Sequence, residues 1–224
     1  MTTFITSPQL QDDSVVATIQ PKIESMIDEL ITSLPDPKQL TSEERRGMIA
    51  RYTAVLEGNF IYWMTAAYLA VQAEEARPHL VENLYEEVRD AHPAMLRRFA
   101  IAAHAFPTDA DALAVNEDLT KVRLFLGRLS GVQSLVTMAF FEGFIQRFMG
   151  YLADLAAAQG STDMEYTDVH GICDIAHTQG LFEALSAEMA VNPLDPGLDN
   201  YEGAYLLRTL VQTIIYGQKD SLPA

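Results

Sequence analysis

The chain has 224 residues, which is enough for one domain with a sizeable core. Hydrophobic residues make up 49% and charged residues 21%, proportions that are ordinary for a soluble globular protein. With 15 basic residues against 31 acidic ones, the formal net charge is −16, and this negative field argues against nucleic acid and anionic membrane surfaces as partners.

The cysteine content and the apolar segments indicate a cytoplasmic protein. Cys173 is the only cysteine, so no internal disulfide can form and a reducing compartment is expected. We interpret Cys173 itself as a small buried packing residue. Residues 1–8 lack the basic and apolar regions of a signal peptide, and the longest apolar stretch, residues 60–71, is too short to cross a bilayer.

Helical periodicity recurs along nearly the whole chain, and the alternating segments typical of strands are absent. After a polar leader over residues 1–13, a first helix is expected over residues 14–34, where a Pro-Asp-Pro segment ends it. A second, long helix opens with either Thr41 or Ser42 as its N-cap residue, because two acidic residues follow in the first turn.

Proline and glycine mark the boundaries of the later helices. The remaining helical segments are expected from residue 77, from residue 92 to about 106, over residues 113–158 with a break at Ser130-Gly131, over 166–190 and over 201–216. The sequence therefore predicts an all-α fold, a single-domain bundle of about seven helices spanning residues 1–224.

Two histidines and an aspartate, His170, Asp174 and His177, follow one another at i, i+4 and i+7. On an α-helix these spacings place the three side chains on one face. Two imidazoles and a carboxylate are the ligand set preferred by non-haem iron, with zinc and manganese as rivals. The segment predicts a metal-binding motif on a helix.

Glu142 is a candidate ligand because its neighbours at i−7, i−4, i+3 and i+7 are all leucine, isoleucine or methionine. An ionised carboxylate on such an apolar face is costly unless it is paired or binds a metal. Two alternatives remain open at this point: a salt bridge, with Arg147 as one partner, and a neutral buried acid.

A further pair of candidates lies earlier in the chain. Glu87 shares a helix face with Leu80 and Leu84 and should point inward, whereas the neighbouring Glu86 should lie in solvent. His92 precedes a proline, where the chain turns into a new helix and the ring can swing inward. The alternative is that His92 caps that helix in solvent.

The candidate ligands are three carboxylates and three imidazoles: Glu87, His92, Glu142, His170, Asp174 and His177. Six such ligands suit two metal ions, with positions left open for dioxygen. His79 and His104 lack carboxylates at useful spacing, and we interpret them as surface or packing residues. No Glu-x-x-His segment is present, which argues against a ferritin-like di-iron bundle.

With these residues in this order, the chain resembles the haem-oxygenase-like di-iron oxidase family. The family pattern has an Asn-x-x-x-Glu segment, a following His, a Glu on a central helix and a late His-x-x-x-Asp-x-x-His motif. Its counterparts here are Asn83 to Glu87, then His92, Glu142, and finally His170, Asp174 and His177. The resemblance covers about residues 42–216, and its last motif is the most specific. The interval from Glu87 to His92 is short for the family.

The resemblance implies a haem-oxygenase-like fold, a pair of iron ions and dioxygen as co-substrate. It implies an oxidoreductase that N-oxygenates, cleaves C–C bonds or forms nitriles or alkenes, acting on a small amino-acid-like or fatty-acid-like metabolite. It also implies a homodimer and leaves an external electron donor open. Haem binding is not expected, because the first helix has no histidine. The alternatives are a metal-free enzyme similar to thiaminase II or pyrroloquinoline-quinone synthase, and a non-enzymatic binding protein on the same fold.

Two sets of side chains bear on the substrate. A carboxylate-bearing substrate would need an inward cation, for which the candidates are Arg51, Arg123, Arg147 and Arg208. The oxidisable tyrosines that would matter if they lay near iron are Tyr52, Tyr62 and Tyr166. The sequence does not choose within either set.

Overall fold

The computed structural model describes the backbone of residues 9–217 and the side chains from Thr18 onward. This part of the chain contains eight helices and no strand, which confirms the predicted all-α fold. The helices are α1 (Gln9–Thr32), α2 (Ser42–Ala70), α3 (Arg77–Arg89), α4 (His92–Ala102), α5 (Asp109–Leu126), α6 (Gly131–Ala158), α7 (Glu165–Val191) and α8 (Glu202–Tyr216).

Several helix boundaries differ from the prediction by a few residues: α4 ends at Ala102 rather than at about residue 106, and α5 begins at Asp109 rather than at residue 113. Helix α1 begins at Gln9 rather than at residue 14, and residues 1–8 of the predicted leader lie outside the described residues. The break predicted at Ser130-Gly131 is confirmed, and it divides the expected 113–158 segment into α5 and α6. Leu129, just before the break, has a φ of 56°, a left-handed conformation that no helix continues through. Counting both halves gives eight helices rather than about seven.

Capping boxes begin both α2 and α5. The Thr41 hydroxyl accepts a hydrogen bond from the Glu44 N–H, and the Glu44 carboxylate accepts one from the Thr41 N–H at 2.7 Å. Thr108 and Asp111 make the same reciprocal pair at the start of α5. Each box satisfies N–H groups that the first turn of a helix leaves unpaired. Thr41 is therefore the N-cap residue of α2.

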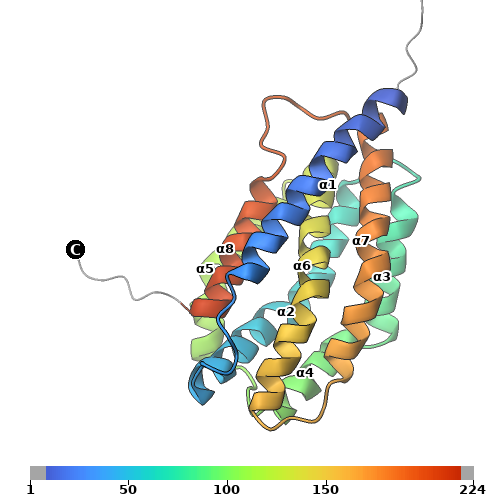
Figure 1. Ribbon diagram of the computed structural model, residues 1–224. Helices are drawn as coiled ribbons and strands as arrows, with labels where there is room; N and C mark the ends of the chain where they lie inside the picture. Colours follow the sequence, from blue (N-terminus) through green and yellow to red (C-terminus); the bar gives the residue numbers. More distant parts are fainter. Residues whose placement is uncertain (1–8, 218–224) are drawn as a thin grey trace, which may run out of the picture.

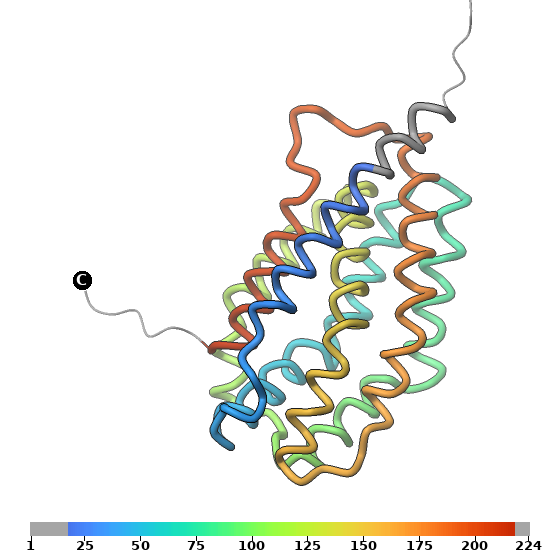
Figure 2. Tube along the Cα trace, viewed as in Figure 1, coloured from blue at the N-terminus to red at the C-terminus, as the bar shows by residue number. Residues whose placement is uncertain are grey.

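Helix α6 runs through the middle of the bundle, with α1, α2, α7 and α8 packed around it (Figures 1 and 2). Every residue from Gly131 to Ile145 is buried. A helix that is apolar on all sides has to be covered by other helices, and Glu142 on α6 is buried with the apolar residues around it. Although α6 is apolar, none of the described helices combines the length and hydrophobicity needed to cross a membrane.

Helix α7 lies alongside α6 and also packs against α3 and α4 (Figure 1). The sharp corner between α3 and α4 depends on Ala91, which has φ 54° and ψ 43°. This left-handed conformation costs an alanine roughly 1–2 kcal/mol, so packing elsewhere must compensate for it. The corner ends α3 and starts α4 beside α7, and it thereby brings residues 83–92 opposite residues 166–177.

Helix α8 packs so closely against α5 and α6 at Gly203 that even one added methyl group should destabilise the fold. A Cβ added at Gly203 would overlap the side chains of Thr137 on α6 and Phe125 on α5. We expect Gly203→Ala to lower the free energy of unfolding by about 1–3 kcal/mol, measured by urea denaturation.

The matched control is Gly150→Ala, because a Cβ at Gly150 on α6 meets no atom within 4 Å. There the higher helix propensity of alanine should raise the free energy of unfolding by roughly 0.5–1 kcal/mol. Equal effects of the two substitutions would contradict this packing.

Candidate metal centre

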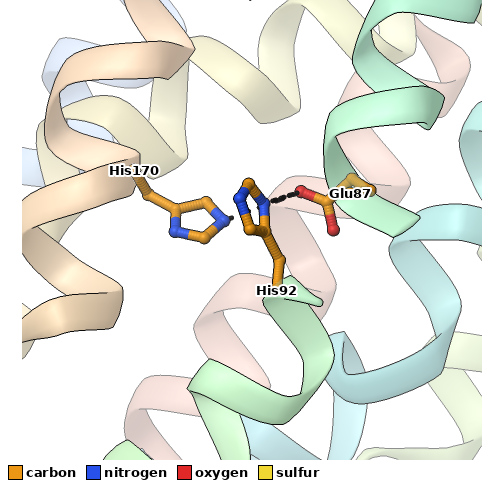
Figure 3. A group of neighbouring side chains, drawn as sticks. All are labelled: Glu87, His92 and His170. Carbon is orange, nitrogen blue, oxygen red and sulfur yellow. Dashed lines mark hydrogen bonds and ion pairs between the residues drawn. The ribbon is translucent and has the colours of Figure 1, made fainter. Parts of the chain in front are cut away.

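Three buried side chains from three helices meet beside the α3–α4 corner: Glu87 of α3, His92 of α4 and His170 of α7 (Figure 3). His92 Nδ1–H donates to Glu87 Oε1 at 2.7 Å, and His170 Nε2 lies 3.6 Å from the same oxygen. The two imidazole rings are 4.5 Å apart between centroids. One donor atom from each residue lies within 4.8 Å of the other two. We call these three residues the first group.

The backbone of α7 orients His170. Its Nδ1–H donates to the carbonyl oxygen of Tyr166 at 2.8 Å, one turn earlier on the same helix. This bond places the proton on Nδ1 and leaves Nε2 facing Glu87, which is the arrangement found for metal-binding imidazoles. The Tyr166 ring packs against the imidazole, with centroids 4.2 Å apart, and its hydroxyl shares a 2.9 Å hydrogen bond with the Tyr52 hydroxyl.

Charge within the first group is stabilised by contacts between its own members. Burial alone would raise the pKa of Glu87, but the adjacent imidazole of His170 and the hydrogen bond from His92 outweigh burial and hold the pKa below the ordinary value. Burial likewise opposes protonation of His170, yet the Glu87 carboxylate raises the pKa of that imidazole. The group therefore favours a negative carboxylate that faces nitrogen donors.

Another set of donors follows on α7. Side-chain atoms of Cys173, Asp174 and His177 lie within 4.8 Å of one another, and we call these residues the second group. His177 Nδ1 lies 3.6 Å from Asp174 Oδ1, and its Nε2–H donates to Glu86 Oε2 at 3.0 Å. Glu86 is therefore half-buried against His177, and the expectation that it lies in solvent is wrong. A carboxylate on Nε2 leaves Nδ1 free to face a metal.

Glu142 lies between the two groups. It lines one small cavity together with Glu87, His170 and Asp174, and its Oε1 lies 4.0 Å from His177 Nδ1. The Asn83 amide donates to the same Oε1 atom.

Arg147 is not the salt-bridge partner of Glu142, because it pairs with Asp28, and the cationic group nearest to Glu142 is the His177 imidazole when protonated. Burial, and then the nearby Asp174 carboxylate, raise the pKa of Glu142 well above its usual range. Without a cation, this carboxyl group is favoured in its neutral form.

Unsatisfied buried atoms test whether these residues fit a metal ion. Among the described side chains, Asp174 Oδ2 and Asn83 Oδ1 are buried oxygens with no hydrogen-bond partner. Asp174 is only 2% exposed and Glu142 1%, so two nearly water-free carboxylates lie close together beside imidazole nitrogens. Leaving such groups uncompensated is expensive, and a cation bound between them would compensate them. Oxygen and imidazole donors of this kind suit iron.

The comparison with known proteins agrees with this donor chemistry. A family model described as an iron-containing redox enzyme matches residues 49–200, which is more than half of the chain and includes every candidate ligand. The chain belongs to this family. No curated protein matches the sequence. The resemblance to a haem-oxygenase-like family that uses non-haem iron is thus confirmed at the level of the family and the fold.

The iron-containing redox enzyme fold brings the six predicted ligands into one region, but it divides the α7 stripe between two groups. His170 faces Glu87 and His92, whereas Asp174 and His177 face each other and Glu142. The alternative in which His92 caps α4 in solvent is wrong, because His92 is 3% exposed.

Sequence reasoning missed several partners of these ligands. Asn83 bonds Glu142, Glu86 bonds His177, and the Cys173 thiol donates to Asp174 Oδ1 at 3.2 Å. No local pattern signals the first two contacts, because they depend on how α3 is rotated against α6 and α7, and the third depends on the side-chain rotamers of two adjacent residues. Of the three oxidisable tyrosines, Tyr166 is buried against His170, Tyr52 is buried against Tyr166, and Tyr62 is 49% exposed. The other two histidines are partly or largely exposed, as expected.

The pKa of His177 predicts how the metal-free protein responds to pH. Burial opposes its protonation, but Asp174 and Glu142 raise the pKa of this imidazole from 6.5 to about 9. When the pKa of a group is higher in the folded state than in the unfolded state, the group stabilises the protein fully at pH values below its unfolded-state pKa. This stabilisation is lost as the pH rises through the folded-state pKa. The raised pKa of Glu142 likewise makes the protein less stable as the pH rises above the unfolded-state pKa of that glutamate. With allowance for solvent screening, the free energy of unfolding should fall by roughly 1–3 kcal/mol between about pH 6.5 and 9.

The measurement is urea denaturation of chelator-treated protein at both pH values. His177→Gln should flatten the pH dependence, because glutamine does not titrate. His104→Gln is the matched control, since His104 is exposed, and it should leave the pH dependence unchanged. A slope that survives in His177→Gln would show that other groups are responsible.

Proposed function

We propose that this member of the iron-containing redox enzyme family is a non-haem di-iron oxidase or oxygenase that uses dioxygen to oxidise a small metabolite. The observation that carries the proposal is the pair of donor groups on one stripe of α7, with Glu142 placed between them. A site for a single metal ion would need only one of the groups. If the second buried group of acid and imidazole side chains served only to stabilise the core, apolar side chains would do so better.

In this proposal, Glu87, His92 and His170 hold one iron, Asp174 and His177 hold the other, and Glu142 is shared. When bound, the iron pair supplies the electrons and open positions for reduction of dioxygen. The protein orients the ligands: the Tyr166 carbonyl sets the His170 ring and the Glu86 carboxylate sets the His177 ring. Such contacts fix the tautomer and direction of a ligand imidazole.

The surroundings of the first group are largely apolar. Leu56, Phe60 and Leu96 line the same small cavity as Glu87 and Glu142. Its volume of about 20 Å³ is too small for an organic substrate and is close to the space of one water molecule. A dry pocket of this kind strengthens electrostatic contacts and protects an oxidising site from side reactions.

The substrate would reach the metal centre through a cavity beside the second group. A cavity of about 330 Å³ between α3 and α7 is lined by His177, Cys173 and Glu86, a volume within the range of small-ligand sites. Glu82 adds a second carboxylate to the cavity wall, and among the residues that the structure describes neither arginine nor lysine lines it.

The four candidate arginines are engaged elsewhere: Arg51 with the carbonyls of Ile214 and Ile215, Arg123 with Asn59, Arg147 with Asp28 and Arg208 with Glu29. Of the amino-acid-like and fatty-acid-like classes, an amine-bearing substrate suits this acidic wall better. Homodimerisation and an external electron donor stay predictions.

Iron binding tests the proposal directly. We expect metal-free protein to take up two equivalents of Fe(II) per chain, and exposure to dioxygen to produce a transient visible absorption band. His170→Ala and Asp174→Ala each remove a ligand from a different group, so each should lower the iron content. His104→Ala is the control and should retain both equivalents, because His104 lies in solvent. A wild-type chain that binds no iron, or a His170→Ala chain that keeps both equivalents, would refute the proposal.

The role of Glu86 is tested by comparison with its neighbour Glu82. Glu86→Ala removes the acceptor on His177 Nε2 and should weaken binding of one metal equivalent by about 10–100-fold, leaving the other equivalent unchanged. Glu82→Ala removes a carboxylate from the same cavity wall, where Glu82 is exposed, and should change neither affinity. Isothermal titration calorimetry with Fe(II) under anaerobic conditions measures the affinity for each equivalent in both variants. Equal losses in both variants would mean that net charge, and not imidazole orientation, is responsible.

A further inference from the structure

The thiol of Cys173 points into the second group rather than into the hydrophobic core. It donates to Asp174 Oδ1 at 3.2 Å, and its sulfur, an Asp174 oxygen and a His177 nitrogen lie within 4.8 Å of one another. Cys173 is only half-buried, so the interpretation of this residue as buried packing is wrong. Its spacing to His177 is one helical turn, so the two side chains can reach a common ion.

Asp174 gives independent evidence that an ion belongs there. Its side chain is almost fully buried, yet among the described residues the thiol of Cys173 is its only hydrogen-bond donor, and Oδ2 has no partner at all. A thiol is a weak donor, and the His177 nitrogen, 3.6 Å from Oδ1, forms an ion pair with Asp174 only while the imidazole is protonated. A neutral His177, which is the form that binds a metal, leaves this buried carboxylate with the thiol as its one hydrogen-bond partner among the described residues.

We propose that Cys173 is a metal ligand, supplying a sulfur donor to the second group together with Asp174 and His177. The inference rests on the proposed function only in requiring a metal ion at the second group. On coordination the S–H bond of Cys173 breaks and a bond from sulfur to the metal forms. The released proton leaves to solvent through the 330 Å³ cavity, which both Cys173 and His177 line. A bound metal ion deprotonates a coordinating thiol in this way.

A sulfur donor makes the two groups chemically different. The first group offers only oxygen and nitrogen, whereas the second adds sulfur, which favours softer ions such as zinc and cobalt(II) over magnesium or manganese. The second group should therefore take up Co(II) before the first one does. This order follows from ligand softness alone and does not depend on catalysis.

The test is an anaerobic titration of the full-length, metal-free protein with Co(II), followed by absorption spectroscopy. Cobalt bound by thiolate gives an intense near-ultraviolet charge-transfer band, in addition to the weaker visible bands that any bound cobalt gives. We expect the near-ultraviolet band to grow with the first equivalent in the wild-type protein. The band should be lost in Cys173→Ser while the visible bands remain. Because the chain has one cysteine, this band has a single source.

The outcomes separate this inference from the proposed function. Visible bands for two equivalents without the near-ultraviolet band would overturn the role of Cys173 and leave the two-metal proposal intact. No visible bands at all would overturn both. In His170→Ala the near-ultraviolet band should persist while one equivalent of cobalt is lost, because His170 belongs to the first group.

A second readout uses only the wild-type protein, in case Cys173→Ser does not fold. One equivalent of Zn(II) should block alkylation of the thiol by iodoacetamide, because a metal-bound thiolate is not free to react. An alkylation rate that zinc leaves unchanged would overturn the proposal.

Discussion

The structure depends on one costly arrangement, the burial of carboxylates and imidazoles inside an apolar helical bundle. Glu142 lies on a helix whose first half is buried on every side, and Asp174 lies nearby with one oxygen unpaired. In the absence of a cation, protons must balance this charge, which is why the pKa of Glu142 and that of His177 are both raised. A protein that needed only a stable core would place apolar residues at these positions. The buried charge is therefore the feature of the bundle that agrees best with its membership of an iron-containing family.

The residues of the His-x-x-x-Asp-x-x-His motif on helix α7 belong to two neighbouring groups of donors. Its donors His170, Asp174 and His177 share a stripe, but the stripe is long enough that its start faces the α3–α4 corner and its end faces Glu142 and α3. The left-handed Ala91 matters for the same reason, because the corner that it makes brings His92 to Glu87. The arrangement of the candidate ligands thus depends on the length of α7 and on the left-handed turn at Ala91.

The candidate ligands line two cavities of very different size. The first group and Asp174 line a cavity with room for little more than a water molecule, together with leucine and phenylalanine side chains. Cys173 and His177 line a much larger cavity that also has the carboxylates of Glu82 and Glu86 in its wall. In the proposed function, substrate and incoming ions would enter through the larger cavity. Membership of the iron-containing redox enzyme family is consistent with such a division.

The sequence by itself determined the helical fold, the break before Gly131, the inward face of Glu87 and the stripe on α7. These features depend on residues within a few positions of one another, where helix geometry is nearly constant. Only the tertiary structure decided that Glu86 contacts His177, 91 residues away, and that Arg147 forms its ion pair with Asp28 and not with Glu142. It also decided that Cys173 faces the metal donors rather than the core. Such contacts depend on the rotation and depth of one helix against another, and many distant apolar contacts set these together, so no local spacing encodes them.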